Sequence, residues 1–284
     1  MSPKVYILLP VHNRIEKTKA FIESLLNQSF LNYHLILIDD GSTDGTADYV
    51  KDKVKNLSVI TGKGNWWWGG GLHQGYLWLK RSKASHDDVV LIMNNDTEFA
   101  PDFFKNGLKI LDRNPQSLLL AYAYSKHTGK LMDAGVFVDW RRLIFERALE
   151  PEKINCLSTR GLFLRVCDFF EIGGFHPVLL PHYASDYEFT IRAYHKGLRL
   201  MTDPALRLEM DESATGYRDI GNSKGVAEFL KKYFSKRFAD NPIYGISFVA
   251  LACPWPWKAI NVLRVFYRGV KTILLKLFLS RTRG

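Results

Sequence analysis

The chain has 284 residues, of which 46% are hydrophobic and 24% charged, which suits one large α/β domain with an extension. This composition excludes an intrinsically disordered chain, and the length does not favour two full domains. The formal net charge of +10 lies after residue 216, because residues 217–284 hold 13 Lys or Arg against 3 Asp or Glu, and residues 1–216 sum to zero. A basic appendage on a neutral body favours an anionic membrane surface over nucleic acid as partner.

The three cysteines, Cys156, Cys167 and Cys253, are too widely spaced for a CxxC metal site or a disulfide framework. The first residues enter a strand without a basic-then-apolar leader, which predicts no signal peptide. No run of about 18 uncharged apolar residues is present, which predicts no spanning helix. We therefore expect a cytoplasmic protein, peripheral at the inner face of the cytoplasmic membrane.

Apolar runs and helical patterns alternate along the first hundred residues. A strand over Val5–Pro10, a helix over Glu16–Gln28 and a strand over Leu35–Ile38 form a β-α-β unit. A helix over 47–53, strands over 57–60 and 89–93, and a helix after Gly71 follow. Beyond Pro115 the pattern is more mixed, with a strand over 118–122, a hairpin around 135–146 and helices over 166–171 and 187–196. The alternation predicts a Rossmann-like, doubly wound, mostly parallel sheet whose ligand lies at the carboxyl ends of its strands.

Two adjacent carboxylates, Asp39 and Asp40, close the second strand and open the turn-rich segment 39–46. At the mouth of a parallel strand they can accept hydrogen bonds from the N3–H of uracil or thymine and from a ribose hydroxyl. The alternative is a solvated acidic turn that caps the next helix.

Six short motifs occur in a fixed order over roughly residues 4–215. They are Pro10-Val11-His12-Asn13-Arg14, the segment 39–46, Asn94-Asn95-Asp96-Thr97, Gly161-Leu162-Phe163-Leu164-Arg165, Gly173-Gly174-Phe175 and Ser185-Asp186-Tyr187-Glu188. In this order and spacing they resemble the family 2 glycosyltransferases, which have the GT-A fold. The resemblance implies a catalytic domain over 1–216, with a nucleotide-binding part (about 1–115) and an acceptor part (about 116–216). Residues 217–284 would form a basic, mostly helical extension.

The resemblance also implies an activity. It is the inverting transfer of a hexosyl or deoxyhexosyl group from a nucleotide-diphosphate donor, a UDP- or dTDP-sugar. The acceptor would be a saccharide or a lipid-linked saccharide in bacterial surface glycan synthesis, such as O-antigen. Homo-oligomerisation stays open.

Asn94-Asn95-Asp96 aligns with the Asp-x-Asp metal motif of that family. Asp96 would hold Mg or Mn on the donor diphosphate, with Asn94 and Asn95 as substrate contacts. Asn94 departs from the pattern because its amide adds no charge. The histidine that often serves as a third ligand is absent from 207–213. Asp211 or Glu209 would replace it, or Asp96 acts with the diphosphate and water alone.

A loop that faces the donor in that family corresponds to residues 65–75. Its expected substrate contacts are Asn65, Trp67, Trp68, Gly70 and Gly71, because glycines let backbone N–H groups approach phosphate oxygens. The alternative for the tryptophans is a place in the core or in a lid.

Further substrate contacts are implied for Pro10, Gly161 and Glu188, the last as a group that orients the acceptor. Asp186 is the expected general base, because inverting transfer needs a carboxylate opposite the leaving group. The alternative is that Asp186 only caps the helix from Tyr187. Asp133 and Arg160 are additional candidates for contact with the acceptor or a phosphate.

The tail over Lys258–Phe278 has helical periodicity. Arg264, Arg268 and Lys271 share one face, and a second face gathers Val262, Phe266, Val270, Ile273, Leu274 and Leu277. With Trp255 and Trp257 ahead of it, this helix is expected to lie in a membrane interface. The alternative is a helix docked on the catalytic domain or on a second subunit.

Two rival functions remain open from the sequence. Asn94 and Ser185, which replace residues of the family motifs, would fit a non-catalytic nucleotide-sugar binding protein. A dinucleotide-dependent oxidoreductase would need GxGxxG after the first strand, where Pro10-Val11-His12-Asn13-Arg14 stands instead.

Overall fold

Four parallel strands form the N-terminal half of the main sheet, in the order β3-β2-β1-β4. The computed structural model describes residues 2–211, 213, 223 and 225–281. The strands span Val5–Val11 (β1), Tyr33–Asp39 (β2), Leu57–Thr61 (β3) and Val89–Ile92 (β4). All four match the apolar runs of the sequence, so the predicted β-α-β pattern is confirmed.

The other half of the sheet is mixed. It contains β5 (Thr97–Phe99), β6 (Ser117–Ser125), β7 (Leu131–Asp133), β10 (Leu162–Arg165) and β11 (Arg199–Met210). Strand β10 runs antiparallel between β4 and β6, β11 is parallel to β6, and β5 and β7 are antiparallel to their neighbours. Parallel pairing therefore dominates only the half that was expected to bind the nucleotide.

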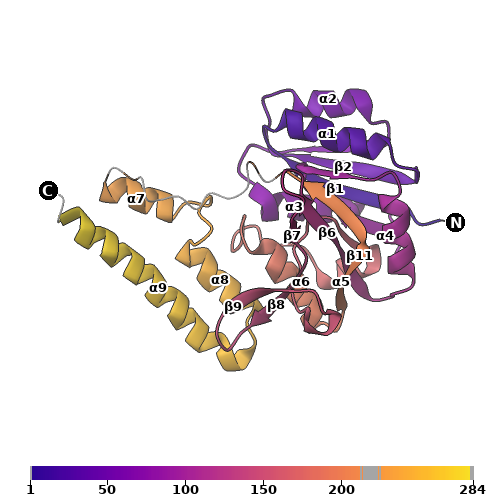
Figure 1. The fold of residues 1–284 in the computed structure, drawn as a ribbon. Coiled ribbons are helices and arrows are strands. Elements are labelled where there is room, and N and C mark those ends of the chain that lie inside the picture. The colour runs from indigo at the N-terminus through magenta and orange to yellow at the C-terminus, as the bar shows by residue number, and fades with distance from the viewer. Residues whose placement is uncertain (1, 212, 214–222, 224, 282–284) are drawn as a thin grey trace.

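Helices cover both faces of this sheet, as Figure 1 shows. One face carries α1 (Ile15–Leu26), α2 (Thr46–Lys53) and α4 (Phe103–Asp112). The other carries α3 (Trp67–Arg81), α5 (Val166–Ile172) and α6 (Ser185–His195). Successive side chains of a strand point to opposite faces, so Ile7 packs under α1 and Leu8 under α3, and both are fully buried. Burial on both faces explains the continuous apolar runs of the parallel strands.

Helix α3 begins at Trp67, five residues earlier than expected, and so includes the glycines of the 65–75 segment. A Cβ atom at Gly75 would come within 2.9 Å of Ile38 and 3.0 Å of Leu8. The glycines thus allow α3 to lie close against the sheet, which aligns its first turn with the carboxyl ends of β1 and β2.

The last three helices lie to one side of the main sheet (Figure 1). They are α7 (Val226–Tyr233), α8 (Pro242–Ala252) and α9 (Trp255–Arg281). Helix α8 packs on a hairpin of β8 (Gly135–Asp139) and β9 (Ile144–Ala148), which precedes a 3-10 turn at Pro151–Lys153. Helix α9 runs along the outside of α7 and α8 (Figure 1). Among the described residues, no helix combines the length and the apolar character that crossing a membrane would require.

Candidate active site

The two carboxylates at the end of β2 have different surroundings. Asp39 accepts a hydrogen bond from the backbone N–H of Ser42 through Oδ1, at 2.8 Å. Asp40 accepts four, from the backbone N–H groups of residues 64, 65, 66 and 67, at 2.8 to 3.1 Å. A carboxylate has about four acceptor positions, so the Asp40 side chain is saturated by the loop. Asp40 therefore fixes the start of α3, and Asp39 keeps more acceptor capacity for the nucleoside contact, which stays a prediction for both residues.

The three consecutive tryptophans diverge. Trp66 and Trp68 pack against the core under α3, and the indole N–H of Trp68 donates to Thr159 Oγ1 at 3.3 Å. Trp67 has a φ of +60°, and its ring lies 5.5 Å from the imidazole of His182. Asn65 is exposed beside it. None of Asn65, Trp67 and Trp68 is fully buried, and their substrate contacts stay predictions.

The glycines of the loop have packing roles. Gly70 and Gly71 are buried in the first turn of α3. A Cβ atom at Gly71 would lie 3.5 Å from both Pro10 and Ile38, and one at Gly70 would lie 3.3 Å from Trp66. Gly70, Gly71 and Pro10 thus contribute to the contact between α3 and the sheet, and their substrate contacts stay predictions.

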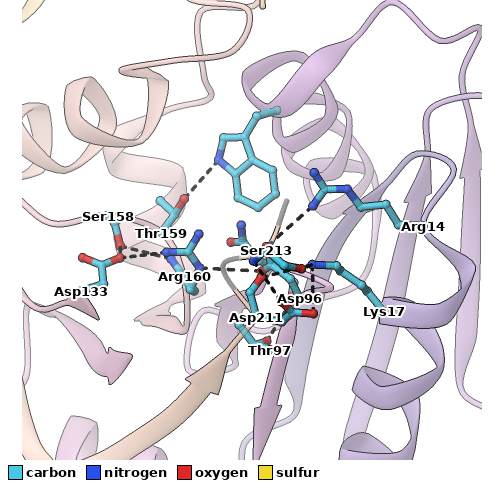
Figure 2. Close-up of polar contacts among 12 residues, drawn as sticks. Arg14, Lys17, Asp96, Thr97, Asp133, Ser158, Thr159, Arg160, Asp211 and Ser213 are labelled. Atoms are coloured by element: carbon cyan, nitrogen blue, oxygen red, sulfur yellow. Dashed lines mark hydrogen bonds and ion pairs between the residues drawn. The ribbon is translucent and has the colours of Figure 1, made fainter. Parts of the chain in front are cut away.

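Asp96 lies between two guanidinium groups, as Figure 2 shows. Its side chain is 1% exposed; Arg14 Nη1 is 3.7 Å from Oδ2, and Arg160 Nε is 3.8 Å from Oδ1. Asp96 Oδ1 and Asn94 Oδ1 are buried and accept no hydrogen bond from the described residues. Buried oxygens without a donor are costly, and oxygen ligands suit a hard divalent cation. Asp96 and Asn94 therefore fit the cation that the resemblance implies.

Asn95 does not join this pair. Its side chain is buried and donates to Thr18 Oγ1 of α1 at 3.0 Å. This hydrogen bond ties the residues after β4 to α1, and the substrate contact of Asn95 stays a prediction.

Asp211 lies next to Asp96, because its backbone N–H donates to the Asp96 carbonyl at 2.9 Å. Its carboxylate contacts Lys17 Nζ and His127 Nε2, both at 3.2 Å. Hydrogen bonds from Ser213, then from His127 and Lys17, hold the pKa of Asp211 well below its usual range. Within the described part of the chain, no three or more His, Cys, Asp or Glu side chains form a metal-binding cluster. The charge of Asp211 is already neutralised by Lys17 and by the surrounding hydrogen bonds. Glu209, the other candidate for the third metal ligand, is exposed on β11.

Asp186 stands in the first turn of α6. The N-cap is Ala184, with a φ of 61°, so Asp186 is not the cap that the alternative interpretation required. Burial raises its pKa to about 6, and the negative charge of Asp133 contributes in the same direction. A carboxylate with a pKa near 6 is a better proton acceptor at neutral pH than an ordinary aspartate.

Arg160 connects the two carboxylate groups of the site. Its Nη1 is 3.4 Å from Asp133 Oδ2, which also accepts a hydrogen bond from Ser158 Oγ, and its Nε faces Asp96 (Figure 2). The Arg160 charge lowers the pKa of Asp186, against the effect of burial. Arg160 and Asp133, which the sequence indicates only as additional candidates, thus lie beside Asp96, and their charges act on the pKa of Asp186.

Two other predicted contacts have structural roles. Glu188 is 2% exposed and forms an ion pair with Arg192 through both oxygens, at 2.8 and 2.9 Å. This ion pair gives Glu188 a structural role, and its orientation of the acceptor stays a prediction. Gly161 has a φ of +79°, and a Cβ atom there would come within 2.7 Å of Leu208. This close packing fixes the backbone next to Arg160, and the substrate contact of Gly161 stays a prediction.

The fold and the site together define the class of GT-A glycosyltransferases. PcManGT, a mannosyltransferase from Pyrobaculum calidifontis solved with GDP-Man and Mn²⁺, aligns with a TM-score of 0.58 and 14% identity, covering 100% of this chain and 76% of that one. S. aureus TarS, solved with UDP-GlcNAc, aligns with a TM-score of 0.60 and 17% identity over 93% and 71% of the two chains. Both share the arrangement of strands and helices described above.

The chain belongs to glycosyl transferase family 2, whose family model matches residues 6–167. It is 24% identical over 170 residues to EpsH of Bacillus subtilis, described as a glycosyltransferase, covering 58% of this chain and 48% of EpsH. TuaG of the same organism, described as a glycosyltransferase of teichuronic acid biosynthesis, is 23% identical over 56% of this chain and 62% of TuaG. The chain thus spans about half the length of EpsH.

Proposed function

We propose that this protein transfers a hexosyl or deoxyhexosyl group from a UDP- or dTDP-sugar to a hydroxyl, with inversion at the anomeric carbon. The observation that carries the proposal is the position of Asp186. It is a partly buried carboxylate with a pKa near 6, and it feels the charges of Asp133 and of Arg160, the guanidinium that also lies beside Asp96. A direct displacement needs a base on one side of the sugar and charge stabilisation on the other. In this proposal Asp186 is the base, and the residues around Asp96 stabilise the charge.

In this mechanism Asp39 binds the nucleoside and Asp186 takes the proton from the acceptor hydroxyl. Asp96 and Asn94 would hold Mg or Mn, which when bound neutralises charge on the departing diphosphate. Arg14 and Arg160 add positive charge at the same place, because each lies within 4 Å of Asp96. No covalent intermediate is required, so positioning and electrostatics account for catalysis.

The direct test is a donor screen. Thermal unfolding would be followed with UDP-, dTDP- and GDP-sugars, with and without Mn²⁺, because a ligand that binds only the folded state raises its apparent stability. Donor hydrolysis without acceptor would then be measured for the sugar that binds. A protein that binds a donor but neither hydrolyses nor transfers it would support the rival function, a non-catalytic nucleotide-sugar binding protein.

We further propose that the extension from residue 217 places the enzyme against the cytoplasmic face of a membrane, where a lipid-linked saccharide would be the acceptor for a surface glycan. Helix α9 packs on α7 and α8 through one side, which includes Val265 and Gly269. Its outer side exposes apolar residues, namely Leu263, Phe266, Tyr267, Val270, Leu274, Leu277 and Phe278. Exposed Arg268 and Lys271 border this surface, which supports contact with anionic lipid.

A further inference from the structure

A guanidinium group from the C-terminal region lies at the mouth of the candidate active site. Arg237 follows α7, and its Cζ atom is 5.5 Å from the centre of the Trp67 ring. The same ring is 5.5 Å from the imidazole of His182, which precedes the proposed base, Asp186, by four residues. Side chains from three distant parts of the sequence therefore meet beside the donor loop and the base.

Trp67 is held in an uncommon conformation. A φ of +60° is unfavourable for a bulky residue other than glycine. The backbone N–H of Trp67 donates to Asp40 at 3.1 Å, which helps to hold this conformation. Trp66 and Trp68 pack into the core, whereas the Trp67 ring faces His182 and Arg237. Backbone strain of this kind concentrates at ligand sites, so the orientation of Trp67 points to binding.

The surroundings of Trp67 are positively charged. Burial, together with the positive charges of Arg14 and Arg237, lowers the pKa of His182 to about 4. The imidazole is therefore neutral near pH 7. Arg237 is exposed, and no acidic side chain among the described residues forms an ion pair with it. An exposed guanidinium that rests on an indole can bind an anion through its edge while its face stays on the ring.

We propose that Arg237, stacked on Trp67, is a phosphate-binding residue of the active site supplied by the C-terminal region. This inference rests on the proposed transfer from a nucleotide sugar. The phosphate belongs either to the donor diphosphate or to an acceptor that carries a phosphate group, since both would meet beside Asp186. In either case residues 225–281 complete the catalytic site, in contrast to the separate appendage that the charge distribution alone suggests.

The experiment compares Arg237→Gln and Arg237→Lys with the wild type, and uses Lys236→Gln as a matched control on the neighbouring exposed residue. The donor arm measures the binding of UDP and dTDP against uridine and thymidine by calorimetry. The acceptor arm measures the binding of phenyl phosphate with the donor site filled by excess nucleoside diphosphate. Arg237→Gln should weaken phosphate binding in one arm by roughly ten- to a hundredfold, the effect of losing a hydrogen bond to a charged group. Arg237→Lys should retain part of it, and Lys236→Gln should change neither arm.

The outcomes separate the two phosphate sources. Weaker diphosphate binding with unchanged nucleoside binding assigns Arg237 to the donor, and weaker phenyl phosphate binding assigns it to the acceptor. The inference is overturned if Arg237→Gln binds every ligand as the wild type does. It is also overturned if the binding of nucleoside and the binding of nucleoside diphosphate weaken equally, because equal losses would reflect a displaced Trp67 ring. A wild-type protein that binds no nucleoside diphosphate refutes the proposed function itself, and this inference with it.

Discussion

Replacement of Asp186 by Asn should lower activity and raise stability at the same time. A pKa raised from 3.8 to about 6 corresponds to about 3 kcal/mol between the two protonation states. Because the residue is only partly buried, we expect about half of this value, 1 to 2 kcal/mol. The folded-state pKa lies above the unfolded-state value, so the ionised carboxylate destabilises the fold. This cost is absent below about pH 4, grows as pH rises and is complete above about pH 6.

Asn carries no charge and can still accept the hydrogen bond that Asp186 takes from the backbone N–H of Tyr187. The variant should therefore melt a few degrees higher than the wild type at pH 8 and at the same temperature near pH 4. Transfer should fall by about a hundredfold or more with donor binding preserved. In the wild type, kcat/KM should rise with pH through about 6, since that is the pKa of the free base.

Asp168 provides the matched control. It is a buried carboxyl on α5 whose pKa is also raised by burial, and it lies outside the group formed by Asp96, Asp133 and Asp186. Asp168→Asn should stabilise the protein at high pH in the same way and leave transfer unchanged. The reasoning fails if Asp186→Asn keeps near-normal turnover, or if it gives no more stability at pH 8 than at pH 4.

Four further substitutions test the rest of the site. Asp96→Ala should abolish transfer, and Asn94→Asp should be tolerated and reduce the metal concentration needed; full activity in excess chelator would contradict both. Asp40→Ala removes an acceptor of four hydrogen bonds, so it should cost about 2 to 4 kcal/mol of stability and raise the donor KM, measured by urea unfolding and initial rates. Glu188→Gln should destabilise the fold by about 3 kcal/mol yet leave the acceptor KM unchanged at low temperature; a selective rise in that KM would restore its predicted role.

The parallel half of the fold could be predicted from sequence because its strands are buried on both faces. Their apolar runs are therefore continuous, and polar residues such as Asp39 and Asp96 mark where they end. The mixed half of the sheet was harder to predict from the sequence. Strand β10 has only four residues, and β5 has three, so neither leaves a clear pattern. Their pairing is decided by tertiary contacts that no local window contains.

Within the site, the sequence gives the type of each residue but not the contacts that decide its role. Asp40 and Asp39 are adjacent, yet only the structure shows that four N–H groups saturate one of them. Motif spacing could not reveal His127 beside Asp211, because they are 84 residues apart. Arg237 was likewise counted as part of a basic tail, and its contact with Trp67 depends on how the C-terminal helices fold back.

The last prediction concerns α9 and a membrane. The apolar face predicted for this helix is partly confirmed, since its residues Phe266, Val270 and Leu274 are exposed. Val262 and Ile273 instead pack inward, and Arg264 Nη1 donates to the Arg141 carbonyl at 2.6 Å. The helix thus docks on the protein and also presents an apolar face. Deletion from Pro254 would expose Tyr233 and Pro242, which lie beneath α9. Loss of vesicle binding by the truncated protein could then result from unfolding as well as from loss of a lipid-binding surface.

Substitution on the outer face avoids this difficulty. Leu263 and Leu274 are 65% and 59% exposed, so Leu263→Ser with Leu274→Ser should leave the melting temperature unchanged. Sedimentation with vesicles containing anionic phosphatidylglycerol should fall strongly, and it should fall for the wild type as salt rises. Lys271→Glu should act in the same direction, whereas Lys83→Glu, the same charge change on an exposed residue outside α9, should have little effect. If the double variant still binds vesicles, or if it instead dissociates a dimer, the exposed face of α9 is a protein interface and the membrane proposal is wrong.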